Sequence, residues 1–262
     1  MQTLAQAPAS LLLLDYDGTL APFTTERSRA YPYPGVAAAI EEILRDGRTR
    51  VVVITGRDAA DIPVLLQTRP CPEVWGIHGL QHLKADGTTE TKSLDEPTLY
   101  ALSDAHRWLA YQRLLQRAES KTGALAVHWR GRRKMEVEDI RGRVLLGWRP
   151  IAECGGLDLL DFDGGVEIRA REANKGRLVR TLLNEMSPNT SAAYLGDDTT
   201  DEQAFHAIQD HGLSVLVRPS WRQTTAQLWL GPPGELLDFL GRWLKACKKR
   251  GASGTSAAVG KT

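Results

Sequence analysis

The sequence predicts an α/β protein with a Rossmann-like, doubly wound parallel sheet as its core and a smaller α+β cap domain inserted into it. The apolar run Leu11–Leu14 is typical of a strand that is buried on both faces of a parallel sheet, and the β-branched run at Arg50–Ile54 indicates a second strand. These runs alternate with helical patterns, which is the order of βαβ units. The alternation stops near Pro97 and resumes near Asn174, and the segment between them follows a different order.

The first part of the core contains three predicted strands and two predicted helices. The strands are expected at 11–14, 50–54 and 74–79, and the helices at 36–44 and 58–67. Pro63 fits the second helix only in its first turn. Leu80 to Thr88 is expected to form a hairpin with its turn at Ala85-Asp86-Gly87.

The middle of the chain reads as helix, strand, helix, strand, strand. The expected ranges are 98–119, 124–130, a helix with apolar positions from Val137 to Trp148, 157–161 and 166–169. This order indicates an inserted α+β domain at 97–171, which divides the core into 1–96 and 172–247.

The βαβ pattern resumes after the insertion. A helix is expected at 177–185, strands at 191–195 and 213–217, and a closing helix at 236–246. Residues 248–262 are basic and then rich in Gly, Ser and Ala, so they are expected to be a disordered tail.

The bulk composition excludes several classes of function. The chain has 262 residues, with 33 basic and 32 acidic side chains and a net charge of +1, so no global field attracts nucleic acid or a membrane surface. It contains no apolar stretch long enough to cross a bilayer. Met1 to Ser10 lacks the features of a secretory signal, and three widely spaced cysteines show no metal-binding pattern. A cytoplasmic protein with reduced thiols is expected.

Polar residues gather at the boundaries of the predicted core elements. They are Asp15 and Asp17, Thr55-Gly56-Arg57, Lys175, and Asp197, Asp198 and Asp201. Strand ends of a doubly wound sheet converge on one crevice. Taken alone, Asp15-Tyr16-Asp17-Gly18 fits a hairpin turn about as well as a catalytic site, and Thr55-Gly56-Arg57 is a weak signal. All the motifs together, each at an element boundary, favour one shared site.

The residue types in these motifs indicate a hard cation beside a phosphate. Carboxylates without a His/Cys set suit Mg²⁺ better than Zn²⁺. Thr55 and the backbone N–H of Gly56 can donate to a phosphoryl oxygen, and Lys175 can pair with a carboxylate nucleophile and the transferring group. Carboxylate attack would form an aspartyl phosphate, while a second carboxyl group protonates the leaving alcohol and later deprotonates water. Asp15 and Asp17 can divide these two roles.

The order of motifs resembles that of the haloacid dehalogenase superfamily of phosphatases. The matching segments are Asp15-Tyr16-Asp17-Gly18-Thr19-Leu20, Thr55-Gly56-Arg57, Lys175 and Gly196-Asp197-Asp198-Thr199-Thr200-Asp201-Glu202. The resemblance implies that Asp15 is the nucleophile, that Asp17 is the general acid/base, and that Thr55 and Lys175 contact the phosphoryl group. It also implies Mg²⁺ held by Asp15, the Asp17 backbone carbonyl and Asp197, with Asp198 and Asp201 in support.

Further segments resemble the trehalose-6-phosphate phosphatase family. They are Asp15 to Pro22, Gly76-Ile77-His78-Gly79, Glu119-Ser120-Lys121, His128-Trp129-Arg130, and Val166 to Arg169 with Lys175-Gly176. The resemblance implies an α/β cap inserted after the third core strand and Mg²⁺-dependent hydrolysis of trehalose 6-phosphate to trehalose and phosphate. The implied substrate-binding residues are Gly56, Arg57, His78, Glu119, Lys121, His128, Arg130, Glu167 and Arg169. The sequence departs from the family pattern at Thr55, Gln81 and Trp129.

Several alternatives stay open at this point. Glu119 with Lys121, and Glu167 with Arg169, also fit solvent-facing strand positions with cross-strand pairs, and His78 also fits a core histidine. The substrate could be sucrose 6-phosphate or a glycosyl phosphoglycerate instead of trehalose 6-phosphate, and a non-catalytic sugar-phosphate sensor is the hypothesis from another class. The resemblance leaves room for functional coupling to a trehalose-6-phosphate synthase.

Overall fold

The computed structural model describes residues 2–24, 26–162 and 164–255, without the side chains of residues 2, 3 and 249–255. The chain forms two compact units. The larger unit contains the described residues up to Glu90 and from Lys175 onward, and the smaller unit is Thr91–Asn174.

The larger unit is built on a mainly parallel sheet, which confirms the predicted fold class. Its strand order is β12-β11-β10-β1-β2-β3-β4-β5. The strands are β1 (Ser10–Leu14), β2 (Thr49–Ile54), β3 (Glu73–Gly76), β4 (Gln81–Leu83), β5 (Thr89–Thr91), β10 (Ser191–Gly196), β11 (Gly212–Val217) and β12 (Leu228–Leu230). β1 lies between β10 and β2 and pairs with both in parallel, whereas β4 is antiparallel to β3. All of β1 is buried, as its apolar run predicts.

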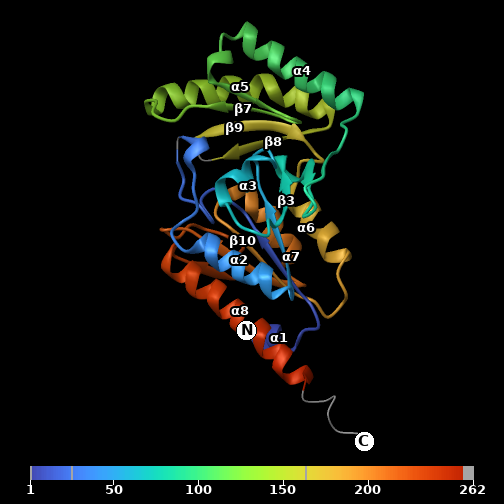
Figure 1. The fold of residues 1–262 in the computed structure, drawn as a ribbon. Coiled ribbons are helices and arrows are strands. Elements are labelled where there is room, and N and C mark those ends of the chain that lie inside the picture. Colours follow the sequence, from blue (N-terminus) through green and yellow to red (C-terminus); the bar gives the residue numbers. More distant parts are fainter. Residues whose placement is uncertain (1, 25, 163, 256–262) are drawn as a thin grey trace, which may run out of the picture. The chain divides into compact units, whose positions relative to one another are not determined.

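Helices cover both faces of this sheet (Figure 1). They are α1 (Gln2–Gln6), α2 (Val36–Asp46), α3 (Asp61–Leu66), α6 (Lys175–Asn184), α7 (Glu202–Ile208) and α8 (Gly234–Thr255). Because side chains alternate along a strand, Leu12 and Leu14 pack with α2, α3 and α8, whereas Leu11 and Leu13 pack with α6 and α7. None of the described helices is long and apolar enough to span a bilayer.

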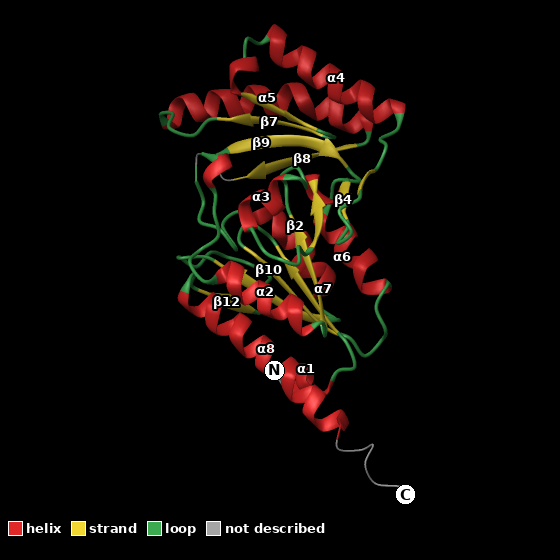
Figure 2. Cartoon of the chain, in the orientation of Figure 1, coloured by secondary structure: helices red, strands yellow, loops and turns green. Residues whose placement is uncertain are grey.

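The smaller unit is a four-stranded sheet with two helices on one face (Figure 2). Its elements are α4 (Glu96–Tyr111), β6 (Ala118–Lys121), β7 (Ala124–His128), α5 (Lys134–Gly155), β8 (Leu157–Phe162) and β9 (Gly165–Ala170). The strands are antiparallel in the order β6-β7-β9-β8. Leu125 and Val127 of β7 join Val144 and Trp148 of α5 in the core of this unit.

Several element predictions were wrong in detail. The helix expected at 98–119 ends at Tyr111, and Glu119 lies on β6 after a 3₁₀ turn at Leu115–Arg117. The strand expected at 74–79 ends at Gly76 and continues as a 3₁₀ turn, Ile77–Gly79. The short elements α1, α7 and β12 were not among the predicted elements.

The closing helix is longer than expected. α8 continues to Thr255, so the part of the expected disordered tail at 248–255 is helical. The charged and small residues there are compatible with a helix that extends from a well-packed start. The rest of the expected tail, 256–262, lies outside the described residues.

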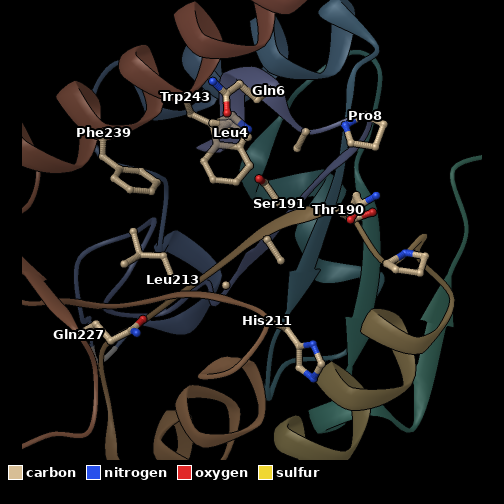
Figure 3. Close-up of a pocket in the computed structure, with 15 residues that line it drawn as sticks. Leu4, Gln6, Pro8, Thr190, Ser191, His211, Leu213, Gln227, Phe239 and Trp243 are labelled. Carbon is tan, nitrogen blue, oxygen red and sulfur yellow. The ribbon is translucent and has the colours of Figure 1, made fainter. Parts of the chain in front are cut away.

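The larger unit has a cavity of about 670 Å³ at the amino ends of β10 and β11 (Figure 3). Leu4, Phe239 and Trp243 line its apolar side, and Ser191, His211 and Gln227 contribute polar groups. The predicted catalytic motifs follow the carboxyl ends of the strands. This cavity lies at the amino ends, so it is separate from those motifs.

Candidate active site

Asp15 lies directly after β1 and is held by two side chains. Lys175 at the start of α6 donates from Nζ to Asp15 Oδ1 at 2.6 Å, and Thr19 Oγ1 donates to Asp15 Oδ2 at 3.0 Å. The Asp15 backbone N–H donates to the Leu195 carbonyl at the end of β10. The fold therefore joins residues 160 positions apart in one buried ion pair.

Asp201 organises the other side of this cluster. Its Oδ1 accepts hydrogen bonds from Lys175 Nζ at 2.7 Å and from Tyr194 OH at 2.6 Å. Its Oδ2 accepts from the backbone N–H groups of Asp197 and Asp198 at 3.1 and 3.0 Å. Because both oxygens are occupied by donors, Asp201 orients Lys175 and the 197–198 backbone.

Asp197 completes an acidic cluster that is suited to a cation. One carboxylate oxygen from each of Asp15, Asp197 and Asp201 lies within 4.8 Å of the others. Gly18 allows this approach: its φ is +86°, and a Cβ there would lie 2.1 Å from Asp197 Oδ2. Among the described residues, no hydrogen-bond donor to the Asp197 carboxylate is found, although the residue is 8% exposed.

The cluster carries more negative charge than Lys175 neutralises. Burial raises the pKa of Asp15 to about 7 against the opposing charge of Lys175, and Asp201 adds to the increase. Burial and the charges of Asp15 and Asp201 raise the pKa of Asp197 well above its ordinary value. Burial would lower the pKa of Lys175, but Asp15 and Asp201 outweigh it and raise that pKa. A hard cation on the oxygens of Asp15 and Asp197 would compensate this excess.

Asp17 does not join the acidic cluster with its side chain. Arg57 Nε donates to Asp17 Oδ2 at 2.7 Å, and Arg57 Nη2 donates to Oδ1 at 2.6 Å. Arg57 Nη1 donates to the Arg27 carbonyl at 2.7 Å. Each nitrogen of the guanidinium therefore donates to a protein oxygen. The sequence analysis expected Arg57 to bind the substrate and did not expect these contacts.

Thr55 and Gly56, directly after β2, lie against His78, which follows β3. Thr55 is fully buried, its Oγ1 accepts from the Arg57 backbone N–H at 3.1 Å, and its carbonyl accepts from His78 N–H. A Cβ on Gly56 would lie 2.7 Å from the imidazole of His78. His78 has a φ of +54°, an uncommon conformation for a side chain other than Gly. The imidazole thus packs against the backbone of the Thr55-Gly56-Arg57 motif.

The side chain of Gln81 supports the same loop. Its Oε1 accepts from the Ala59 backbone N–H at 2.9 Å, and its Nε2 donates to Asp58 Oδ2 at 3.1 Å. This departure from the family pattern therefore has a local structural use.

Asp198 uses its carboxylate as a cap. Its Oδ1 accepts from the Thr199 backbone N–H at 2.7 Å at the start of the 3₁₀ turn Thr199–Asp201. Of the two aspartates expected to support the metal, Asp201 lies in the acidic cluster, and Asp198 is not one of its three residues. Arg222 fixes the loop from outside by donating to the carbonyls of Asp197 at 3.1 Å and Asp198 at 2.7 Å.

In the smaller unit, charged side chains project from one face of the sheet. Glu119 and Glu167 lie in one cross-strand row on either side of Ala126, and Lys121 and Arg169 lie in the next row on either side of Ala124. The small alanines leave room for these long side chains. The opposite face of the sheet packs on α4 and α5.

Three ion pairs on this charged face are longer than those of the acidic cluster. Lys121 Nζ lies 3.4 Å from Glu167 Oε2 and 4.0 Å from Glu119 Oε2, and Arg169 Nη1 lies 3.9 Å from Glu167 Oε1. His128 Nε2 lies 2.9 Å from Glu119 Oε2. Five of the six cap residues named from the sequence thus share one face.

The sixth residue, Arg130, lies beyond the end of β7. It is exposed, and its aliphatic stem covers Gly164, where a Cβ would lie 2.5 Å from Arg130 Cγ. The neighbouring Trp129 is 8% exposed and belongs to the core of the smaller unit.

Sequence reasoning gave no role to three residues of the larger site and underrated a fourth. Thr19 lies inside the first motif, four residues after Asp15, and its hydroxyl was the available signal. Tyr194 looks like an ordinary strand residue, and Arg222 belongs to no motif. Asp201 was named only as a supporting residue, although its contacts organise the cluster.

Comparisons with known proteins agree on one family. The sequence model of the trehalose-phosphatase family matches residues 13–228. A trehalose-phosphate phosphatase of Mycobacterium marinum is 28% identical over 249 residues, which cover 90% of this chain and 61% of that protein. The chain therefore spans less than two thirds of the length of this relative.

Solved structures show the same fold. A trehalose-6-phosphate phosphatase structure from Aspergillus fumigatus superposes with a TM-score of 0.72 at 24% identity and covers 94% of this chain and 96% of that one. The C-terminal domain of a Candida albicans trehalose synthase regulatory protein superposes with a TM-score of 0.73 at 11% identity, covering 90% and 95%. The fold is thus shared by proteins described as a phosphatase and as a regulatory protein.

Proposed function

Because the chain belongs to the trehalose-phosphatase family, we propose that it hydrolyses trehalose 6-phosphate to trehalose and phosphate through an aspartyl phosphate on Asp15. The observation that carries this proposal is the buried contact of 2.6 Å between Lys175 Nζ and Asp15 Oδ1 at the carboxyl end of β1. A carboxylate held in this way is aimed and partly neutralised before an anionic substrate arrives.

In the first half-reaction, a free lone pair of Asp15 attacks phosphorus while the ester P–O bond breaks. Lys175 screens the repulsion between the carboxylate and the phosphoryl oxygens, and Thr55 and the backbone N–H of Gly56 donate to those oxygens. Asp17 gives a proton to the departing sugar oxygen. In the second half-reaction Asp17 takes a proton from water, which attacks phosphorus and releases Asp15.

Magnesium fits the donor set at this site. The cluster offers carboxylate oxygens of Asp15 and Asp197 with raised pKa values, and the backbone carbonyl of Asp17 would add a third oxygen. When bound, Mg²⁺ would supply charge neutralisation for the nucleophile and the phosphoryl group. Asp201 would support it by holding the backbone N–H groups of Asp197 and Asp198, and Asp198 would support it by capping the turn that begins at Thr199.

The smaller unit would serve as the cap that recognises the sugar. Its charged face offers both acceptors and donors for vicinal hydroxyls, from Glu119, Glu167, Lys121, His128 and Arg169, with Arg130 at the end of β7. The contacts of Lys121 with Glu167 and Glu119, at 3.4 and 4.0 Å, are long, so a sugar hydroxyl could replace them.

Release of phosphate from a panel of sugar phosphates tests the proposal. We expect trehalose 6-phosphate, with Mg²⁺, to be the preferred substrate over sucrose 6-phosphate and glycosyl phosphoglycerates. Turnover of one of these alternatives without turnover of trehalose 6-phosphate would overturn the proposed substrate. Loss of turnover on chelation and its return with Mg²⁺ tests the cation.

A non-catalytic sensor is the second candidate, because a regulatory protein shares the fold. The presence of Asp15, Asp17, Lys175 and Asp197 in one site favours an enzyme. Binding of trehalose 6-phosphate without any phosphate release would favour the sensor.

We further propose a cytoplasmic enzyme whose substrate comes from a trehalose-6-phosphate synthase. Cys71, Cys154 and Cys247 are free thiols, as expected in a reducing compartment. We propose a sugar phosphate as its ligand, and neither nucleic acid nor a membrane as a partner.

A further inference from the structure

Arg57 holds Asp17 by a two-point contact of the kind that fixes both direction and distance. Its Nε and Nη2 take one oxygen each of the Asp17 carboxylate, at 2.7 and 2.6 Å. Charge-assisted bidentate pairs of this kind are among the strongest hydrogen-bonding arrangements in proteins. Burial would lower the pKa of Arg57, but the hydrogen bonds and charge of Asp17 outweigh it and raise that pKa.

Arg57 is the fixed member of the pair. Its side chain is 2% exposed, whereas that of Asp17 is 29% exposed. The Arg27 carbonyl accepts from Nη1 at 2.7 Å, and the guanidinium carbon lies 5.7 Å from the centre of the Tyr16 ring. Tyr16 is itself buried and donates to the Ala30 carbonyl at 2.8 Å. The arginine therefore has a defined position from which it can aim a more exposed carboxylate.

The two neighbouring carboxylates have separate cations. Asp15 contacts Lys175, and Asp17 contacts Arg57. Each Asp17 oxygen accepts one of these contacts and keeps a second lone pair. Asp17 can therefore carry a proton on that second lone pair while Arg57 fixes the direction of the carboxyl group.

We propose that Arg57 is a positioning residue that acts through Asp17 and does not bind the substrate. This inference rests on the proposed function. In the first half-reaction the proton of the Asp17 carboxyl group passes to the ester oxygen as the P–O bond breaks and the Asp15–phosphorus bond forms. In the second, water loses a proton to Asp17 as its oxygen bonds to phosphorus and the Asp15–phosphorus bond breaks. Arg57 aims the carboxyl group in both steps and exchanges no proton.

The test compares a poor leaving group with a good one. A sugar alcohol needs a proton to leave, whereas p-nitrophenolate does not, and kcat/KM reports the step in which the leaving group departs. We expect Arg57→Met to lower kcat/KM by about 10²-fold for trehalose 6-phosphate and by less than about 10-fold for p-nitrophenyl phosphate. Arg57→Lys should fall between, because lysine keeps the charge but not the planar fork.

A double-mutant cycle separates action through Asp17 from an independent role. Asp17→Asn should show the same leaving-group dependence as Arg57→Met. The double variant should lose no more than about the larger single loss, since residues that act as a unit are not additive.

Arg50→Met is the matched control at the other end of β2. Arg50 holds Glu73 by the same two-point contact, at 2.9 and 3.0 Å, away from the proposed catalytic groups. We expect it to leave the ratio of the two kcat/KM values unchanged. Thermal unfolding of all variants identifies any that fail to fold, and Arg57→Lys then replaces Arg57→Met.

Substrate affinity distinguishes positioning from binding. In the Asp15→Asn background, calorimetry with trehalose 6-phosphate should give the same Kd with and without the further substitution Arg57→Met. A weakened Kd, equal losses on both substrates, or additive losses with Asp17→Asn would each overturn the positioning role. If trehalose 6-phosphate is not a substrate, the proposed function fails. The double-mutant cycle of Arg57 and Asp17 is then measured with the sugar phosphate that the enzyme does hydrolyse. An enzyme inactive on every phosphate ester overturns both.

Discussion

The acidic cluster of the larger unit and the charged face of the smaller unit contain similar residue types in different arrangements. In the acidic cluster, Lys175 Nζ lies 2.6 Å from Asp15 and 2.7 Å from Asp201, and all three residues are at most 4% exposed. On the charged face, Lys121 Nζ lies 3.4 Å from Glu167 and 4.0 Å from Glu119.

This difference separates two physical tasks. Short buried contacts fix the reacting atoms, as covalent catalysis needs. Long contacts leave donors and acceptors that can exchange their partners for hydroxyl groups of a ligand. Substitutions in the acidic cluster should therefore affect turnover, and substitutions on the charged face should affect affinity.

The largest effect is expected for Asp15→Asn. The amide removes the nucleophile while it keeps the size of the side chain, so phosphate release should fall by about 10⁴-fold or more. Trehalose 6-phosphate should still bind, which calorimetry would measure. Turnover near the wild-type rate would exclude Asp15 as the nucleophile.

Gly18→Ala should cause the next largest loss. The new Cβ would lie 2.1 Å from Asp197 Oδ2 and would displace that carboxylate. A displacement of this size in a catalytic group can cost about 10²-fold in kcat, and steady-state assays over a range of Mg²⁺ concentrations would measure it.

Gly87→Ala is the matched control for backbone strain. Gly87 has a φ of +87°, close to the +86° of Gly18, but nothing lies within 4 Å of the added Cβ. Both variants should have a lower melting temperature than the wild type. Only Gly18→Ala should also have a lower kcat at a temperature where both variants are folded. Equal activities in the two variants would show that the approach to Asp197 is unimportant.

The sequence predicted the acidic cluster better than its surroundings. Buried parallel strands are apolar runs, so their ends are visible, and polar residues that follow them meet at one edge. This reasoning brings Asp15, Lys175 and Asp197 together, as the structure does.

Contacts that depend on side-chain direction were not predictable in this way. Arg57 and Asp17 are 40 residues apart, and only the turn after β2 decides that the guanidinium meets that carboxylate. The run Ile77-His78 looks like the end of a strand because of its apolar start, but both residues have positive φ values. Glu119 was placed on a helix end because the apolar pattern of α4 fades gradually, whereas the chain turns at Leu115–Arg117.

A more moderate effect is expected on the charged face. Lys121→Met should raise KM for trehalose 6-phosphate by about 10-fold to 100-fold through lost hydrogen bonds, with a smaller change in kcat. The effect on p-nitrophenyl phosphate, which has no sugar, should be small. Arg141→Gln is the control, because it removes an exposed pair with Asp161 in the same unit. A fall in kcat with unchanged KM would place Lys121 in the chemistry instead.

The smallest effect is a pH-dependent difference in stability without metal. Burial and neighbouring carboxylates raise the pKa of Asp15 to about 7 from 3.8. Between these values the folded protein holds a proton that the unfolded chain has lost, so the free energy of unfolding falls as pH rises through this window. Asn at this position does not titrate. Asp15→Asn should therefore melt several degrees above the wild type at pH 8 in chelator, and the difference should narrow toward pH 5.

Magnesium should remove most of this difference. A cation on the Asp15 and Asp197 carboxylates compensates the ionised form, so Mg²⁺ should raise the melting temperature of the wild type at pH 8 more than that of Asp15→Asn. Asp210→Asn, at an exposed position, should show neither effect. The difference in melting temperature between the wild type and Asp15→Asn could instead be the same at every pH. Lys175 alone would then compensate the unfavourable burial of the Asp15 carboxylate. The acidic cluster would then resemble the charged face in needing no cation, and magnesium would not be required to compensate its charge.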